Sequence, residues 1–127
     1  MYIDTNVYLD FLLKREAFSD YAGRLFAEAA SCKHTIILSE LVLRELQKYV
    51  LPDEVRGLFA VLDKKFERVS IGDVDATVAD TVLTRAADAL HVALARRSGA
   101  DCIVTRNVRD FRHVFKTKMP ENILGGR

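Results

Sequence analysis

The chain is 127 residues long, is 50% hydrophobic and 29% charged, and carries a net charge of +1. These values are typical of one soluble globular domain, and the net charge does not by itself suggest binding to nucleic acid. It has no apolar run close to the ~20 residues of a membrane span and no signal-peptide pattern, and its two isolated cysteines, Cys32 and Cys102, do not suggest a zinc site. We therefore expect a single domain covering residues 1–127, located in the cytoplasm with both thiols reduced.

Short β-prone runs alternate along the chain with longer segments in which apolar residues recur at helical spacing. The first run is Tyr2–Ile3, and an apolar helical segment follows the turn at residues 4–6. Later strands are expected at residues 35–38, 68–71 and 102–105, with a last edge strand near residues 123–124. Helices are expected to begin at or just after the capping or first-turn residues Ser19, Ser39, Pro52, Asp73 and Asp88, and after Arg106. The helix at Asp88 should end at Gly99.

This alternation predicts an α/β fold with three layers, in which helices cover both faces of a central, mainly parallel sheet of four to five strands. In a parallel sheet the carboxyl ends of the strands lie along one edge, and functional groups gather there. Polar residues follow three of the predicted strands, namely Asp4, Ser39 and the segment 105–107. We therefore expect the functional site at this edge.

Acidic residues stand close to these strand ends. Asp4 follows the first strand, Glu45 lies in the helix after the second, and Asp88 opens the helix that precedes the fourth. Helix capping would explain Asp4 and Asp88 singly, and a surface pair with Lys48 would explain Glu45. Around one edge of one sheet, however, the three carboxylates would repel one another and raise each other's pKa. A divalent cation with a preference for oxygen ligands, Mg²⁺ or Mn²⁺, would remove that penalty.

Four segments, taken in order, resemble the successive motifs of the PIN-domain ribonucleases, in the small bacterial and archaeal branch that includes VapC-type toxins. They are MYIDTNVYLDFLL at residues 1–13, ILSELVLRELQKY at 37–49, ADALHVALARRSGADCIVTRN at 87–107 and RDF at 109–111. The resemblance extends from residue 1 to about residue 111. It implies a PIN-like fold and an endoribonuclease that hydrolyses RNA phosphodiester bonds with Mg²⁺ or Mn²⁺ as cofactor.

The resemblance assigns Asp4, Glu45 and Asp88 as metal-binding and catalytic residues. Many members carry Asp at the position of Asn107, so the fourth position falls either to Asn107 or to the nearby Asp110, and the number of metal ions, one or two, stays open. A neutral amide can orient a metal-bound water but neutralises no charge. We expect Asn107 to face the site and bind water or RNA, because it lies two residues past the strand end, and Asp110 to be mainly a helix cap or an outer-sphere group.

Four hydroxyl or amide side chains near the strand ends are candidates for orienting the metal ligands or a water molecule: Thr5, Asn6, Ser39 and Thr105. Turn and cap chemistry would explain the same residues, and for Ser39 we favour capping. His91 lies three residues after Asp88 on the same predicted helix, which would allow it to face the site. We favour the alternative, an imidazole packed inside the helices.

Basic side chains concentrate near the end of the chain. Residues 1–95 hold 11 Lys and Arg against 15 Asp and Glu, whereas residues 96–127 hold 8 against 3. Three arginines in this basic segment, Arg106, Arg109 and Arg112, are candidates for contacts with RNA phosphates. A solvated terminal segment would explain the same distribution.

By this resemblance, we expect the toxin of a toxin–antitoxin pair, with RNA as substrate, a small antitoxin protein as partner and a homodimeric state. The alternative is a catalytically inactive PIN-like module that binds RNA or protein. Two other families with an Asp after the first strand fit less well. A haloacid-dehalogenase-like phosphatase requires Asp at the position of Asn6, and a receiver domain requires Lys at the position of Arg106.

Overall fold

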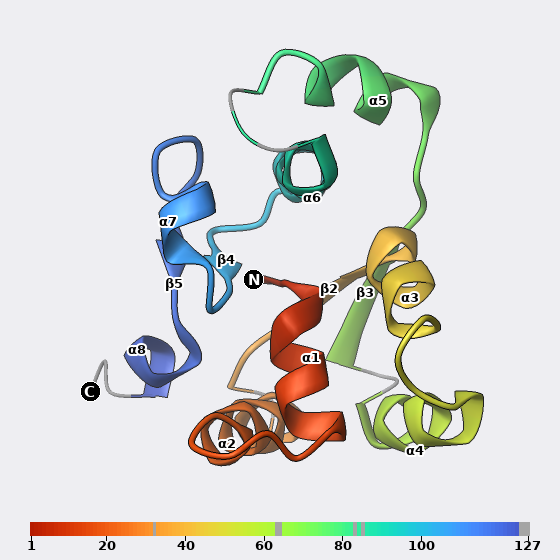
Figure 1. Ribbon diagram of the computed structural model, residues 1–127, viewed down its shortest axis with the longest axis vertical. Helices are drawn as coiled ribbons and strands as arrows, with labels where there is room; N and C mark the ends of the chain where they lie inside the picture. Colours follow the sequence, from red (N-terminus) through yellow and green to blue (C-terminus); the bar gives the residue numbers. More distant parts are fainter. Residues whose placement is uncertain (32, 63–64, 83, 85, 125–127) are drawn as a thin grey trace.

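Five strands form one all-parallel sheet in the computed structural model, which describes residues 1–31, 33–62, 65–82, 84 and 86–124 (Figure 1). The strands are β1 (Tyr2–Ile3), β2 (Ile36–Ser39), β3 (Phe66–Val69), β4 (Ile103–Val104) and β5 (Thr117–Lys118), in the order β3-β2-β1-β4-β5. Each neighbouring pair is parallel. The predicted α/β fold with a mainly parallel sheet is confirmed.

Helices lie on both faces of this sheet. They are α1 (Thr5–Leu12), α2 (Ser19–Ala30), α3 (Glu40–Leu46), α4 (Pro52–Leu62), α5 (Asp73–Ala79), α6 (Ala86–Arg97), α7 (Val108–Phe111) and α8 (Pro120–Leu124). Figure 1 shows α5 and α6 on one side of the sheet and α1, α2, α4 and α8 on the other, which gives the three predicted layers. Within these layers α5 packs on α6, and α2 lies against both α1 and α8.

The central position of β1 determines where the polar strand ends meet. Tyr2 is fully buried and pairs with Ile37 of β2 on one side and with Ile103 of β4 on the other. Because helices exclude water from both faces, the central strands are continuously apolar. The next residue, Asp4, therefore leaves the sheet between the carboxyl ends of β2 and β4, at the edge where we expected the site.

The predicted positions of two strands are wrong. The third strand begins two residues earlier than expected, at Phe66, and the last edge strand is Thr117–Lys118 instead of the segment near residues 123–124. That segment belongs to α8, which starts at Pro120, a residue whose fixed φ suits the first position of a helix. Leu124 is buried, so the apolar residues at the end of the chain belong to a packed helix and not to a strand.

Two predicted helix starts also shift. Ser19 is the first residue of α2 and not its N-cap, which is Phe18. The helix α6 begins at Ala86, so Asp88 lies in its first turn and does not open it. The predicted end of α6 is confirmed, because Gly99 follows the helix with a φ of +74°, a conformation that glycine adopts without steric strain.

We expected free thiols and no helix that spans a membrane. Cys102 is a buried free thiol, whereas Cys32 lies outside the described residues. In the part of the chain that the structure describes, none of the helices has the length and apolar character needed to cross a bilayer.

Candidate metal centre

Asp4 lies at the junction of β1 and α1 and is only 6% exposed. Its backbone is extended, with φ −67° and ψ 151°, and its Oδ1 accepts a hydrogen bond from the backbone N–H of Thr5 at 2.8 Å, as in an N-cap. Its Oδ2 accepts a second bond from the Thr105 hydroxyl, also at 2.8 Å. Burial raises the pKa of Asp4, and the charge of His91 and these two hydrogen bonds only partly oppose the rise.

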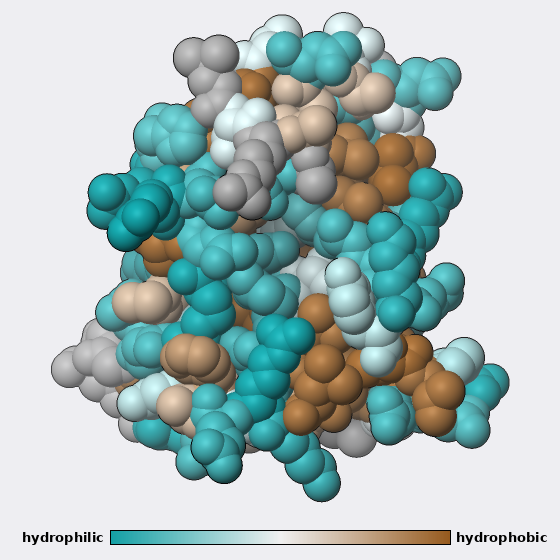
Figure 2. Space-filling model, viewed as in Figure 1, coloured by the Kyte–Doolittle hydropathy of each residue, from teal (hydrophilic) through white to brown (hydrophobic). Residues whose placement is uncertain are grey.

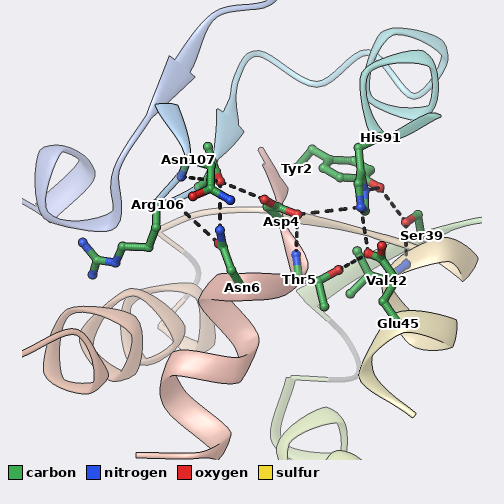
Figure 3. A network of polar contacts seen from close by, with 11 residues as sticks. Tyr2, Asp4, Thr5, Asn6, Ser39, Val42, Glu45, His91, Arg106 and Asn107 are labelled. Carbon is green, nitrogen blue, oxygen red and sulfur yellow. Dashed lines mark hydrogen bonds and ion pairs between the residues drawn. The ribbon is translucent and has the colours of Figure 1, made fainter. Parts of the chain in front are cut away.

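Glu45 reaches the same place from α3 (Figure 3). Its Oε1 accepts hydrogen bonds from the Thr5 hydroxyl at 2.5 Å and from His91 Nε2 at 2.8 Å. Partial burial acts to raise the pKa of Glu45, but the hydrogen bonds and the charge of His91 outweigh it, so the pKa is lowered. The centre therefore contains one carboxyl group with a raised pKa, that of Asp4, beside one with a lowered pKa.

His91 is packed inside the fold, as we favoured from the sequence, and it also faces the site. Its side chain is 2% exposed, as expected for packing inside the fold, but its Nε2 also lies 3.7 Å from Asp4 Oδ1, in addition to its bond with Glu45. Burial acts to lower the pKa of His91, and the two carboxylates raise it more strongly. The signal in the sequence was the spacing of three residues from Asp88, which places both side chains on one face of α6.

The hydroxyl of Ser39 serves two partners. It accepts a hydrogen bond from the backbone N–H of Val42 at 3.2 Å, so Ser39 caps α3 as predicted. It also lies 2.7 Å from the hydroxyl of Tyr2, which in turn lies 2.6 Å from His91 Nδ1 (Figure 3). The cap of α3 is therefore connected to the imidazole of the metal centre.

Asp88 and Asn107 join Asp4, Glu45 and His91 around one opening of about 300 Å³. One ligand atom from each of Asp4, Glu45 and His91 lies within 4.8 Å of the others, which makes these three a candidate metal-binding group. Asp88 is partly exposed and lines the opening outside this compact group. The three predicted acids therefore meet at one site.

The two candidates for the fourth position lie differently. Asn107 lines the opening, and its backbone N–H donates to Thr105 Oγ1 at 3.0 Å. Asp110 lies in the first turn of α7, is not among the residues that line the opening, and accepts a bond from Thr84 through its backbone carbonyl at 2.8 Å. Of the two side chains, only that of Asn107 is placed where it could contact a ligand at the opening.

Thr105 and Asn6 connect the segments after β1 and β4. Besides its bond to Asp4, Thr105 Oγ1 accepts from Asn6 Nδ2 at 3.3 Å. Asn6 Oδ1 in turn lies 3.4 Å from the backbone nitrogen of Arg106. Thr5 and Thr105 therefore contact the carboxylates of Asp4 and Glu45 directly, and Asn6 contacts Thr105. Their role in orienting ligands stays a prediction.

Arg106 is directed away from the opening (Figure 3). Its Nε lies 3.1 Å from Asp10 and its Nη1 lies 2.6 Å from Glu121, while its guanidinium stacks over the ring of Phe18 at 4.2 Å. To contact an RNA phosphate, Arg106 would have to leave these partners. The side chains of Arg109 and Arg112 are exposed at α7.

Two basic residues that the sequence did not single out for RNA binding, Arg15 and Lys48, line the opening itself. Arg15 follows α1 and pairs with Asp10 at 3.4 Å, and Lys48 follows α3. Both side chains extend from exposed residues into the rim of an acidic site. They are better placed than Arg106 to contact an anion at the metal centre.

Comparison with known proteins gives a family match and a set of similar folds. A profile described as the PIN domain matches residues 1–109. No curated protein sequence matches the chain.

Solved structures with a similar fold include chains of three protein–DNA or toxin–antitoxin complexes. A chain of VapBC2 from Rickettsia felis, bound to a DNA fragment from its promoter, is 18% identical with a TM-score of 0.65, over 93% of this chain and 96% of that one. A chain of FitAB bound to an IR36 DNA fragment is 14% identical with a TM-score of 0.67, over 94% of each chain. A chain of a toxin–antitoxin complex from Klebsiella pneumoniae is 20% identical with a TM-score of 0.65, over 94% of this chain and 96% of that one. At these identities the likeness is one of fold.

The first testable prediction concerns the imidazole of His91 in the metal-free protein. Because Glu45 and Asp4 raise its pKa, NMR titration of the ring should give a value above the ~6.5 of an unperturbed histidine. Replacing Glu45→Gln should lower that value. A pKa at or below about 6.5 in the unaltered protein would contradict the arrangement.

The same shift has a consequence for stability. Since the folded state binds the proton more tightly than the unfolded chain, protonation of His91 stabilises the fold fully below about pH 6.5, and this contribution is lost as the pH rises through the folded-state pKa. The difference in unfolding free energy between the unaltered protein and His91→Gln should therefore shrink between pH 6 and pH 9 in urea titrations without metal.

Proposed function

Because the chain belongs to the PIN-domain family, we propose that it is a divalent-metal-dependent endoribonuclease that hydrolyses RNA phosphodiester bonds. One observation carries the proposal, namely that Asp4, Glu45 and Asp88 meet with His91 around a single opening at the carboxyl edge of the sheet. Carboxylates gathered in this way repel one another unless a cation neutralises them. The cofactor that we propose is Mg²⁺ or Mn²⁺.

The residues at the opening fit such a cation. An ion with ligand distances of ~2.1 Å spans about 4.2 Å between opposite ligands, so atoms that already lie within 4.8 Å of one another need to move only slightly. Hydrogen bonds from Thr5 and Thr105 hold the carboxylates of Asp4 and Glu45 in place. Asp4 and Glu45 would bind the ion directly, with Asp88 close by at the rim.

The bound ion would supply an activated water and charge stabilisation at the scissile phosphate. The protein's own residues have three tasks around it. Thr5 and Thr105 orient the carboxylates, and Asn107 at the rim is placed to hold a water or an RNA group. Arg15 and Lys48, which line the opening, would contact phosphates of the bound RNA. Arg109 and Arg112 would contact RNA further from the metal.

The alternative function is that of an inactive PIN-like module that binds RNA or protein. The observation in its favour is Asn107, which leaves the fourth position without a charge. Such a module would bind RNA through the same rim but would cleave none. Cleavage of a mixed RNA pool with and without added Mg²⁺ or Mn²⁺ separates the two functions.

Removing a carboxylate tests the catalytic assignment. Asp4→Asn and Asp88→Asn should each reduce metal-dependent RNA cleavage by about 100-fold or more, the scale on which loss of one electrostatic group slows a reaction. Asp4→Asn should leave the metal-free protein as stable as before or more stable, because the charge of Asp4 is buried. The matched control is Asp80→Asn, an exposed carboxylate after α5, which should change neither property. If both site variants cleave like the unaltered protein, the catalytic site lies elsewhere.

The fourth position can be tested by titrating Mn²⁺ into two variants. Asn107→Asp adds a negative charge at the opening and should tighten Mn²⁺ binding by roughly tenfold. Asp110→Asn should change the affinity by less than about twofold, since its side chain does not line the opening. A large loss in Asp110→Asn without a gain in Asn107→Asp would show that Asp110 holds the fourth position.

We further propose that the protein is the toxin of a toxin–antitoxin pair and forms a homodimer. The structures with a similar fold include complexes described as toxin–antitoxin, or bound to promoter DNA. The protein also has an apolar hollow of about 480 Å³ between α1, α2 and α4, lined by Phe11, Phe26 and Leu58 among others. Figure 2 shows hydrophobic surface over the region where Figure 1 places the end of α1 and α4.

An antitoxin segment of suitable chemistry would bridge this surface and the metal centre. Leu51 and Tyr49 are large exposed hydrophobic residues, and Tyr49 also lines the acidic opening. A peptide with apolar residues on this surface and an arginine at the opening would replace the charge of the cation by an ion pair with Asp4 or Glu45. Such a peptide would block the metal centre.

Expression without a partner tests the toxin role. The unaltered protein should arrest growth of its host, and Asp4→Asn should not, because growth arrest would depend on RNA cleavage. A protein that cleaves RNA in vitro but is harmless when expressed alone would contradict the toxin role and leave the ribonuclease activity standing.

A further inference from the structure

The compact group at the candidate metal centre consists of two of the predicted acids, Asp4 and Glu45, and an imidazole, that of His91, where we expected the third acid, Asp88. His91 Nε2 lies 2.8 Å from Glu45 Oε1 and 3.7 Å from Asp4 Oδ1, and it is His91, not Asp88, that shares the 4.8 Å cluster with these two acids. His91 is buried, with only 2% of the residue exposed. Its position is therefore fixed by packing and not by chance contact at a surface.

The other ring nitrogen of His91 is bound into a buried chain of hydroxyl groups. Nδ1 lies 2.6 Å from the hydroxyl of Tyr2, which lies 2.7 Å from Ser39 Oγ. The backbone N–H of Val42 donates to the same Oγ at 3.2 Å. Tyr2 and Ser39 are both fully buried, so without these bonds their hydroxyl groups would be costly to enclose.

This chain of hydroxyl groups is able to accept a hydrogen bond from Nδ1, as the second nitrogen of a metal-binding histidine requires. Ser39 Oγ accepts from the backbone N–H of Val42, and the Tyr2 hydroxyl lies between that oxygen and His91 Nδ1. When the Tyr2 oxygen accepts from His91 Nδ1–H, Nε2 can bind a metal ion in exchange for the proton that it donates to Glu45 in the metal-free protein. Histidines that bind metals usually have their second ring nitrogen fixed by such a partner, which sets the tautomer and the ring orientation.

We propose that His91 Nε2 is a direct metal ligand together with Asp4 and Glu45, and that the site therefore binds transition-metal ions such as Mn²⁺ and Co²⁺ more tightly than Mg²⁺. The preference follows from the ligand set, because imidazole nitrogen binds transition metals well while Mg²⁺ prefers oxygen. Asp88, at the rim of the opening, would then act through a metal-bound water. This inference rests on the proposed metal dependence of the function and specifies which metal the site takes.

The direct test is pulsed EPR of Mn²⁺ bound to the unaltered protein. Coordination by His91 should give a hyperfine coupling to one directly bound imidazole nitrogen, and His91→Gln should remove it. The matched control is His34→Gln, since His34 also pairs with a carboxylate, Glu28, at 3.0 Å but lies away from the opening. The nitrogen coupling should persist in that control.

Binding constants for Mg²⁺ and Co²⁺, measured by calorimetry on the same proteins, test the selectivity. The unaltered protein should bind Co²⁺ at least about tenfold more tightly than Mg²⁺. His91→Gln should remove most of that difference by weakening Co²⁺ binding and leaving Mg²⁺ binding within about threefold. Tyr2→Phe should weaken Co²⁺ binding by about 10-fold or more while the ring stays in place, because it removes the partner of Nδ1.

Two results would overturn the assignment, and they differ in what else they affect. If bound Mn²⁺ shows no nitrogen coupling and His91→Gln weakens all metals equally, His91 is a positioning residue for Glu45, and the ribonuclease proposal stands with an all-oxygen site. If no divalent metal binds to the unaltered protein, the metal-dependent function fails as well.

Discussion

The buried carboxylate of Asp4 is the constraint on which the rest of the site depends. It sits at the end of the central strand β1 and is almost completely removed from water, so each of its oxygens needs a partner. Thr5 supplies one from the start of α1, and Thr105 supplies the other from the end of β4. These two bonds hold β1, α1 and β4 together and fix the charge where a cation would bind.

The same residues contribute to the fold and to the site. Ser39 caps α3 and also holds the hydroxyl of Tyr2, and Thr5 begins α1 while its hydroxyl holds Glu45. Capping and ligand orientation, which were alternatives in the sequence, are therefore not exclusive. A strand end that starts a helix provides unpaired backbone donors, and a polar side chain that satisfies them is held rigidly enough to orient a ligand.

The sequence was sufficient where a local run or a family motif carries the information. Continuous apolar runs predicted the central strands, and the ordered motifs predicted that Asp4, Glu45 and Asp88 lie around one opening. It was insufficient where partners are distant. The strand Thr117–Lys118 has no apolar pattern and exists because its backbone pairs with β4. Likewise the direction of the His91 ring depends on Tyr2, which lies 89 residues away in the chain.

The distribution of charge around the opening, and not along the chain, determines what can bind there. The basic residue next to the site in sequence, Arg106, is paired with Asp10 of α1 and with Glu121 of α8. The cations at the opening are instead Arg15 and Lys48, which surround a centre that is negative in the absence of metal. A polyanion approaching this centre is attracted by the rim and repelled by the carboxylates. A bound divalent cation would remove the repulsion by the carboxylates. Under the proposed function the metal therefore enables both the approach of RNA and its cleavage, and metal and RNA should bind cooperatively.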